Sequence, residues 1–534
     1  MKPLQKKLNF SPINIVKNHW LFFVILTLGI IARTWDFGNT PPGLNPDEAS
    51  IGVEAYYLYK FGMDRNGISY PVHLISWGSG QNALYAYLLI PFIALKGLST
   101  EAIRLPMMLS GILALPLMHR AGSQLFGKKY GLIAMFFLAI SPWHIANTRW
   151  AVESNILPFI FLAGFAFLLE TKQNQNWFFP AIICFSLSLY AYGTTYIAVP
   201  IFLLIGIPVI IRYGKLGTKR LILGLGLFLL TSLPILLFII INLFKLESLH
   251  LGSITIPRLP VEARYESLAA VYENNPFRAA TDNLTIMLKL LWNQQDAFVW
   301  NYVDPFGYFY RITFPLAVIG FFYLVWSFRK LNEDSFGYLL LFAWLVASLA
   351  IGVVHPVNLT RLNLIFIPLL LCTVLCVMEI NKRIGYFTPT ITVSLFIAFI
   401  FFNLQYHGES YQKRASEAFN SGILPALEFA SQSTPAMICV TEQTRFGYIY
   451  TFFINSPHPF DYINQIEWVL PPEHPLDPSR TPRSLGVFHF KLSDCANTPD
   501  AIYVLKLKET PPNPAIDYKM KRFDKYQVFL PKPP

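Results

Sequence analysis

Two adjacent carboxylates, Asp47 and Glu48, are the residues of this chain whose type and spacing most suggest chemistry. A carboxylate within hydrogen-bond reach of a hydroxyl group can take its proton as a general base. The pair also fits a structural role, because Asn45, Pro46 and the two acids have the spacing of a capping box at the start of a helix. The acids either only cap this helix or also carry chemistry, and their position in the whole chain must decide between the two.

The composition predicts a membrane protein. The chain has 534 residues, of which 54% are hydrophobic and only 14% charged, and such a balance is too apolar for a soluble protein of this size. The net charge of +11 does not indicate a nucleic-acid partner, because basic residues of membrane proteins gather in cytoplasmic loops. No cleavable signal peptide is expected, since the first apolar run, from Trp20 to Trp35, lacks a small-residue cleavage site.

Apolar runs long enough to cross a bilayer recur along the first 403 residues. A transmembrane helix needs about 20 apolar residues, and the chain offers about eleven such runs. They fall at 18–36, 103–123, 130–148, 154–171, 177–195, 196–212, 221–243, 311–329, 336–354, 361–380 and 386–403.

The loops between these runs predict the orientation. With the amino terminus in the cytoplasm, every inner loop is basic, as the positive-inside rule requires. The outer side then receives the loop 36–102, which carries the two acids, the loop 244–310 and the tail from residue 404. The run 82–98 could also cross, but this would invert all later loops, so we predict an interfacial helix with Tyr85 and Tyr87 at headgroup level.

Two outer regions are expected to carry structure of their own. In the loop 244–310, short amphipathic helices are predicted at 265–272 and 283–292. Residues 404–534 are of ordinary polarity and predict a small extracytoplasmic α/β domain, in which Cys439 and Cys495 are the cysteines that could form a disulfide. Its helical pattern covers 411–431, and its strand-like runs are 436–441, 448–454, 484–490 and 501–507.

Polar clusters at the outer ends of the spans supply further candidate residues. Arg149 and Glu153 lie in the turn 141–155, where they either form an ion pair four residues apart on a helix or take part in function. His355 and Arg361 lie at 355–363, where the arginine either reaches lipid headgroups or holds a substrate phosphate.

The glycine-rich segment 69–82 adds His73 and Gln81 to the substrate-binding candidates, and the helix after the acids adds Tyr57. The glycines of this segment are at least turn formers. His73 with Asp47 and Glu48 would be a weak metal pattern. No phosphate-binding P-loop or dinucleotide motif is present, so a soluble nucleotide is not expected as co-substrate.

Several motifs together resemble the GT-C glycosyltransferases, most closely the branch of bacterial protein O-mannosyltransferases and aminoarabinose transferases. These are the Asp47-Glu48 pair after the first span, the glycine- and tyrosine-rich stretch that ends in a membrane-associated helix, Ile103-Arg104-Leu105-Pro106, and the segment from Ser141-Pro142 through Arg149 and Glu153. The resemblance is good over residues 18–200 and looser to residue 403. It implies a GT-C-like helical membrane domain over residues 1–403, in a bacterial cytoplasmic (inner) membrane.

The resemblance also implies a reaction, which is inverting transfer of a hexosyl or pentosyl group from a polyprenyl-phosphate donor to an acceptor on the periplasmic side. Asp47 matches the catalytic acid of the family and Glu48 its partner, with Glu153 ranked below them. Arg149 and Arg361 are the candidates for the leaving phosphate. A divalent metal near Asp47, Glu48 and Glu153 is possible, and no other cofactor is expected.

The acceptor and the class of protein leave alternatives open. The loop 244–310 carries no long inserted domain of the kind found in eukaryotic protein mannosyltransferases, so a lipid or glycan acceptor is at least as reasonable as a protein. A transporter or flippase would have the same composition, but its ionisable residues are expected near the middle of the membrane, whereas here they gather at outer ends. A non-catalytic envelope assembly factor is the third alternative.

Overall fold

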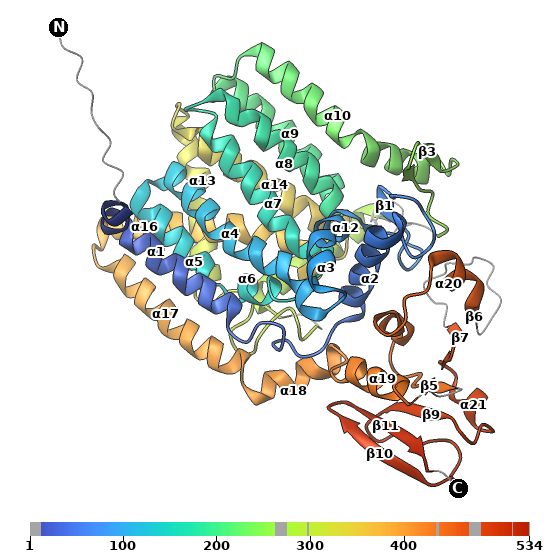
Figure 1. Cartoon of the computed structure of the whole chain (residues 1–534). Helices are drawn as coiled ribbons and strands as arrows, with labels where there is room; N and C mark the ends of the chain where they lie inside the picture. Colours follow the sequence, from blue (N-terminus) through green and yellow to red (C-terminus); the bar gives the residue numbers. More distant parts are fainter. Residues whose placement is uncertain are drawn as a thin grey trace.

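The computed structural model describes residues 12–261, 275–295, 298–433, 437–468, 482–514 and 516–532. Each of the predicted spans contains a helix, and these helices form one bundle, with the C-terminal domain at one end of it (Figure 1). The helices are α1 (Pro12–Thr34), α4 (Thr100–Phe126), α5 (Lys128–Ala139), α7 (Glu153–Glu170), α8 (Phe178–Ala191), α9 (Thr195–Arg212), α10 (Thr218–Leu243), α13 (Thr313–Ser327), α14 (Ser335–Val354), α16 (Phe366–Arg383) and α17 (Phe387–Tyr406).

Seven helices of the described residues are long and apolar enough to cross a membrane, fewer than the predicted eleven. The difference comes from short helices such as α5, α8 and α13, which have 12, 14 and 15 residues. The predicted span 130–148 is not continuous, because α5 ends at Ala139 and a separate short helix, α6 (Pro142–Asn147), follows. Pro142 has no N–H to continue the ladder but suits a first helical turn. The predicted fold class, a helical polytopic membrane protein with a small C-terminal α/β domain, is confirmed.

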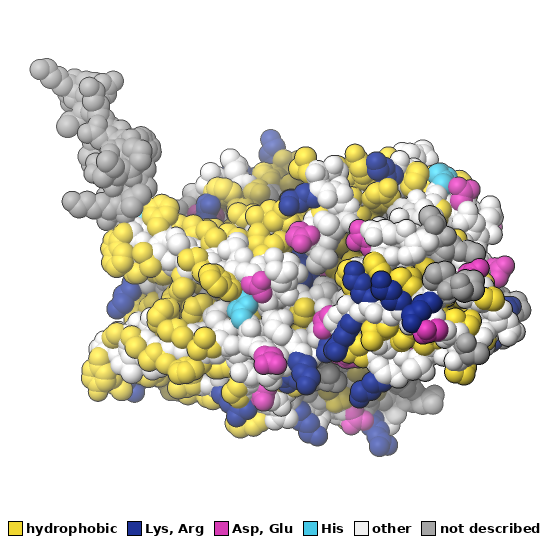
Figure 2. Space-filling model, turned by 60° about the horizontal axis from the view of Figure 1, so that its bottom comes forward, with side chains coloured by type: hydrophobic (Ala, Val, Ile, Leu, Met, Phe, Trp, Pro, Cys, Tyr) yellow, Lys and Arg dark blue, Asp and Glu magenta, His cyan; other side chains and the backbone are white. Residues whose placement is uncertain are grey.

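The bundle has a buried centre and an apolar periphery. Of the residues in the candidate membrane-spanning segments, 83% are buried in the segment that contains α16 and 78% in α7. The share is only 28% in α10 and in α17. Figure 1 places α10 and α17 on opposite edges of the bundle. In the view of Figure 2, hydrophobic side chains cover the α17 end, whereas charged side chains gather toward the C-terminal domain. An apolar outer surface on peripheral helices is what contact with lipid requires.

The first outer loop folds into α2 (Pro46–Phe61), the short strands β1 (His73–Leu74) and β2 (Gln81–Asn82), and α3 (Leu84–Lys96). With 13 residues, α3 is too short to span the hydrocarbon. The expectation of tyrosines at headgroup level is wrong for Tyr85, which is fully buried and donates to the Ile103 carbonyl at 2.7 Å. Tyr87 is half-buried and donates to the Pro71 carbonyl at 3.0 Å. These hydroxyls fasten α3 to the protein.

The second outer loop contains a hairpin, β3 (Leu249–Leu251) and β4 (Ile254–Ile256), and the helix α12 (Pro276–Asn293). The predicted helix 283–292 lies within α12, whereas the predicted helix 265–272 falls outside the described residues. The hairpin reaches the first outer loop, since the Val72 N–H donates to the Thr255 carbonyl at 2.9 Å.

The C-terminal domain packs α19 (Ile423–Ser431) beside a mixed sheet of the strand order β10-β11-β9-β5-β8-β7-β6, and α18 (Glu409–Ala418) connects α17 to α19. The strands are β5 (Ile438–Val440), β6 (Ile466–Trp468), β7 (Pro482–Leu485), β8 (Phe488–His489), β9 (Ile502–Lys506), β10 (Tyr518–Phe523) and β11 (Tyr526–Pro531).

The predictions for this domain are partly right. The strands expected at 436–441 and 501–507 correspond to β5 and β9, and the one expected at 484–490 is split between β7 and β8. The strand expected at 448–454 is wrong, because Gly447–Phe453 forms a 3-10 helix, η5. Cys439 and Cys495, for which the sequence left the question of a disulfide open, are bonded to each other.

Candidate active site

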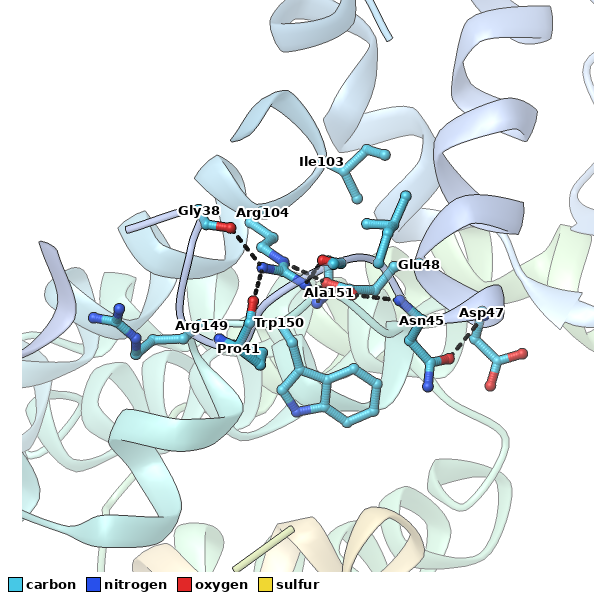
Figure 3. Close-up of polar contacts among 12 residues, drawn as sticks. Gly38, Pro41, Asn45, Asp47, Glu48, Ile103, Arg104, Arg149, Trp150 and Ala151 are labelled. Carbon is cyan, nitrogen blue, oxygen red and sulfur yellow. Dashed lines mark hydrogen bonds and ion pairs between the residues drawn. The ribbon is translucent and has the colours of Figure 1, made fainter. Parts of the chain in front are cut away.

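The two acids lie in the first turn of α2, as their capping pattern predicts. The Asn45 side chain accepts from the Asp47 N–H at 2.9 Å, and the Glu48 side chain accepts from the Asn45 N–H at 3.0 Å. Both halves of the capping box are therefore formed. Although Asp47 and Glu48 are neighbours in sequence, their carboxylates point in different directions (Figure 3) and therefore have different environments.

Glu48 is fully buried and bound on both oxygens. Arg104 of α4 holds it in a bidentate pair, with Nε to Oε1 and one terminal nitrogen to Oε2, both at 2.8 Å. The Ala151 N–H adds a bond of 2.7 Å to Oε1, and the Asn45 N–H bonds to Oε2. Four donors on two oxygens use the acceptor capacity of a carboxylate. Glu48 is thus committed to holding α2, α4 and the turn before α7 together (Figure 3).

Arg104 belongs to the motif Ile103-Arg104-Leu105-Pro106, and no role was predicted for it from the sequence. Its remaining N–H groups donate to the carbonyls of Gly38, Pro41 and Gly43 at 3.2, 2.7 and 2.8 Å. The loop before α2 is thereby wrapped around one buried guanidinium. A charged residue inside a predicted span is costly unless paired, and this signal could have identified Arg104 and its need for a buried carboxylate.

Asp47 is half-buried and much less engaged than Glu48. Among the described residues, the side-chain donor to its carboxylate is the Trp77 indole, whose Nε1–H meets Oδ1 at 3.3 Å. Oδ2 keeps its lone pairs for a proton or a ligand. Of the two acids, Asp47 is therefore the one with an oxygen left open among the described residues.

Glu153, at the start of α7, is joined to the segment 69–82. The Gln81 amide donates to Glu153 Oε2 at 2.9 Å, and Gln81 Oε1 accepts from the Ser76 hydroxyl at 3.1 Å. Ser76 in turn lies 3.3 Å from the hydroxyl of Ser50 on α2. The structure thus connects Gln81 and Glu153, two predicted site residues, to the helix that carries Asp47.

A buried ion pair lies one helical turn beyond Ser50. Arg65 donates to the Ser50 hydroxyl at 2.7 Å and lies 3.0 Å from Glu54 Oε1, and all three side chains are buried. A second carboxylate, Asp64, is buried beside the pair, where the N–H groups of Asn66 and Ile68 donate to it at 2.9 Å. Burial, with repulsion from Glu54 added, raises the pKa of Asp64 to about 7.

Arg149 is buried and engaged with backbone, which argues against both roles considered for it. Its N–H groups donate to five carbonyl oxygens at the end of α1 and beyond, at 2.7 to 3.4 Å. These are the carbonyls of Thr40, Ala32, Arg33, Trp35 and Asp36. A cation there complements the helix dipole and its unpaired carbonyls. The five donors of a guanidinium are then used, so Arg149 forms no helical ion pair with Glu153 and offers no N–H to a phosphate.

Arg361 remains accessible. It is half-buried, and one terminal nitrogen donates to the Pro356 carbonyl at 2.7 Å. Its short helix, α15 (Leu359–Leu362), is followed by Asn363, whose side-chain oxygen accepts from Trp143 and Asn147 at 2.9 and 2.8 Å. The segments 355–363 and 141–155 are therefore joined through a buried amide. His355 is buried at the end of α14.

His73 and Tyr57 have structural contacts where the sequence predicted substrate binding. The His73 ring stacks on Phe238 of α10 at a centroid distance of 4.2 Å, and burial lowers its pKa to about 4. The Tyr57 hydroxyl donates to the Pro457 carbonyl of the C-terminal domain at 2.6 Å. Both side chains hold the outer loop in place rather than pointing into open space.

The carboxylates suggested for a metal do not assemble into a metal site. No group of three His, Cys, Asp or Glu side chains that could hold an ion occurs among the residues described. Glu48 would have to release Arg104 or two backbone N–H groups to become a ligand. The chain's own residues therefore do not fit a cation at Asp47, Glu48 and Glu153.

Comparison with known proteins agrees with this architecture. Residues 82–238 match the family described as dolichyl-phosphate-mannose-protein mannosyltransferase. No curated protein sequence matches. Among solved structures, ArnT from Cupriavidus metallidurans in the apo state is similar at 13% identity and a TM-score of 0.54, over 97% of this chain and 98% of that one.

Two further structures share the fold. ArnT bound to undecaprenyl phosphate is similar at 12% identity and a TM-score of 0.54, over 96% of this chain and 98% of that one. The Archaeoglobus fulgidus oligosaccharyltransferase in complex with Zn and sulfate is similar at 14% identity and a TM-score of 0.52, over 81% of this chain and 61% of that one.

The fold is thus that of the GT-C membrane glycosyltransferases. Together with the family match, it supports the ArnT-like and protein-mannosyltransferase-like branch of that superfamily, as the sequence motifs predicted. The alternative of a transporter or flippase is not favoured.

Proposed function

We propose that this protein transfers a sugar from a polyprenyl-phosphate donor to an acceptor hydroxyl on the outer face of the bacterial cytoplasmic membrane, with Asp47 as the general base. The observation that carries the proposal is the unequal state of the two acids. Glu48 is saturated by Arg104 and two backbone N–H groups, whereas Asp47 is fixed on one oxygen and open on the other.

The reaction is a single displacement. The acceptor oxygen attacks the anomeric carbon, the bond from that carbon to the phosphate oxygen breaks, and the electron pair leaves with the polyprenyl phosphate. The acceptor proton passes to Asp47 Oδ2. One attack from the face opposite the leaving group inverts the anomeric configuration.

The other residues then have separate tasks. Glu48 and Arg104 fix the start of α2, so that Asp47 needs no reorganisation to meet the acceptor. Arg361 is the remaining predicted arginine with free N–H groups, and a guanidinium there stabilises the departing phosphate. Gln81 and Glu153 position the acceptor side of the site.

A donor panel tests the proposal. Purified wild-type protein is incubated with labelled polyprenyl-phosphate hexoses and pentoses and with membrane lipid, glycan or peptide acceptors, beside Asp47→Asn. Transfer from one class of donor, absent in Asp47→Asn, is the expected result and names the sugar. Donor binding without transfer to any acceptor, in wild-type protein shown to be folded, would contradict it.

A further inference from the structure

The C-terminal domain sits directly on the loop that carries Asp47. The Leu44 N–H donates to the Phe419 carbonyl at 2.6 Å, and the Leu44 carbonyl accepts from the Tyr450 hydroxyl at 2.7 Å. Gly43 allows the approach, because a Cβ at this position would collide with the Phe419 carbonyl. The domain therefore pairs with the backbone of Leu44, three residues before Asp47, through residues that lie about 400 positions later in the sequence.

A second contact reaches Asp47 itself through Trp77. The Trp77 indole is buried and donates its N–H to Asp47. The Phe446 ring of the C-terminal domain is stacked on it at 4.2 Å with an angle of 22° between the planes. The Arg65 guanidinium lies 4.6 Å from the indole centroid, within the range of a cation–π interaction.

Phe446 adopts a backbone conformation that bulky residues avoid. Its φ is +55°, in the left-handed region, just before the 3-10 helix η5. Such strain persists in a bulky side chain only where the surrounding structure imposes it, and it gathers at functional sites. Here the strained conformation presents the phenyl ring to Trp77, so the strain and the stacking contact occur in the same residue.

We propose that Phe446 is a positioning residue of the active site, which with Arg65 clamps the Trp77 indole so that its N–H holds Asp47 in the orientation for proton transfer. The inference rests on the proposed function for the role of Asp47. It extends that function by making the C-terminal domain a component of the catalytic centre. The Trp77 side chain has two torsions. Phe446 and Arg65 restrain both by packing against the ring, and this fixes the direction of the N–H. An unclamped indole would leave Asp47 free to rotate.

Three variants separate this role from general packing. Trp77→Phe keeps a flat ring and removes the N–H donor. Phe446→Leu keeps the strained backbone and apolar character and removes the stacking ring. Phe429→Leu is the matched control, since Phe429 packs on Phe523 in the same domain, away from Trp77.

Turnover is expected to fall about tenfold in Trp77→Phe and in Phe446→Leu, with donor KM unchanged, because a hydrogen bond to a charged group is lost. The double variant is expected to be no slower than Trp77→Phe, because both changes act through one bond. Phe429→Leu keeps wild-type turnover. A Phe446→Leu turnover within about threefold of wild type, or losses that multiply in the double variant, would overturn the inference.

A readout without activity keeps this test independent of the proposed function. In protein labelled with 5-fluorotryptophan, Trp77→Phe assigns the fluorine resonance of Trp77 among the 11 tryptophans. Phe446→Leu and Asp47→Asn are both expected to shift that resonance, and Phe429→Leu to leave it in place. If the Trp77 resonance does not move in Phe446→Leu, the inference is wrong. If the resonance shifts as expected but the wild-type protein is inactive, only the proposed reaction is contradicted.

Discussion

Glu48→Gln should lower the free energy of unfolding, although the substitution removes one charge and keeps the volume of the side chain. The carboxylate meets four N–H donors, two from Arg104 and one each from Asn45 and Ala151. Whichever way the new amide turns, its NH₂ group faces two of these donors. Arg104 also becomes a buried cation without a counter-charge. Removing one partner of a buried ion pair costs about 3–5 kcal/mol.

The assay is thermal and denaturant unfolding in detergent micelles, with Asp47→Asn as the control. Both substitutions change a carboxylate into an amide in the same helical turn, but Asp47 is half-buried and has one side-chain donor. The loss expected in Asp47→Asn is within about 0.5 kcal/mol. A double variant, Glu48→Gln with Arg104→Met, should not recover this stability, because the carbonyls of Gly38, Pro41 and Gly43 then lose their donor as well. Equal stability of Glu48→Gln and wild type would refute the structural role assigned to Glu48.

Three further predictions follow from other buried or accessible charges. Arg149→Lys should lower stability by at least about 2 kcal/mol, since several carbonyls at the end of α1 lose their donors, while donor KM stays unchanged. Burial raises the pKa of Asp64 from 3.8 to about 7. The contribution of Asp64 to the free energy of unfolding is therefore fully present below pH 3.8 and is lost as the pH rises toward 7. Asp64→Asn keeps the acceptor oxygen, so unfolding should show it as stable as wild type at pH 4 and more stable at pH 8. Arg361→Ala should weaken donor-lipid binding more than acceptor binding, as measured by the two KM values.

Each of these has an opposite outcome. A raised donor KM in folded Arg149→Lys would return that arginine to the substrate site. A stability profile that Asp64→Asn does not flatten would show that the pH dependence arises in Glu54 or another group facing Asp64. Unchanged donor affinity in Arg361→Ala would mean that this side chain only reaches lipid headgroups.

The sequence predicted much of the fold because its signals are local. The cap at Asn45 and the long apolar runs depend on neighbouring residues, and the structure has helices at the expected places. The run 130–148 is an exception, because it is apolar and long enough to predict one span. The structure instead ends a helix at Ala139 and begins another at Pro142. The strand expected at 448–454 became η5 because a short apolar run does not distinguish a strand from a packed turn.

The site was harder to predict, because its decisive contacts join distant segments. The sequence ranked Asp47 above Glu48 by resemblance alone, whereas the contacts that separate them come from Arg104, Ala151 and Trp77, all distant in sequence. The sequence predicted a phosphate contact for Arg149, but in the structure its N–H groups donate to carbonyls at the end of α1 and just beyond, such as that of Trp35. Phe446 carries no sequence signal at all, since its contact with Trp77 spans two domains.

The role of Asp47 as the general base is tested by the turnover of Asp47→Asn per folded molecule, measured beside its affinity for the polyprenyl-phosphate donor. A general base contributes about 100-fold or more to rate. We expect a loss of at least about that size, with donor affinity and stability unchanged. Turnover within about threefold of wild type would show that Asp47 is not the base.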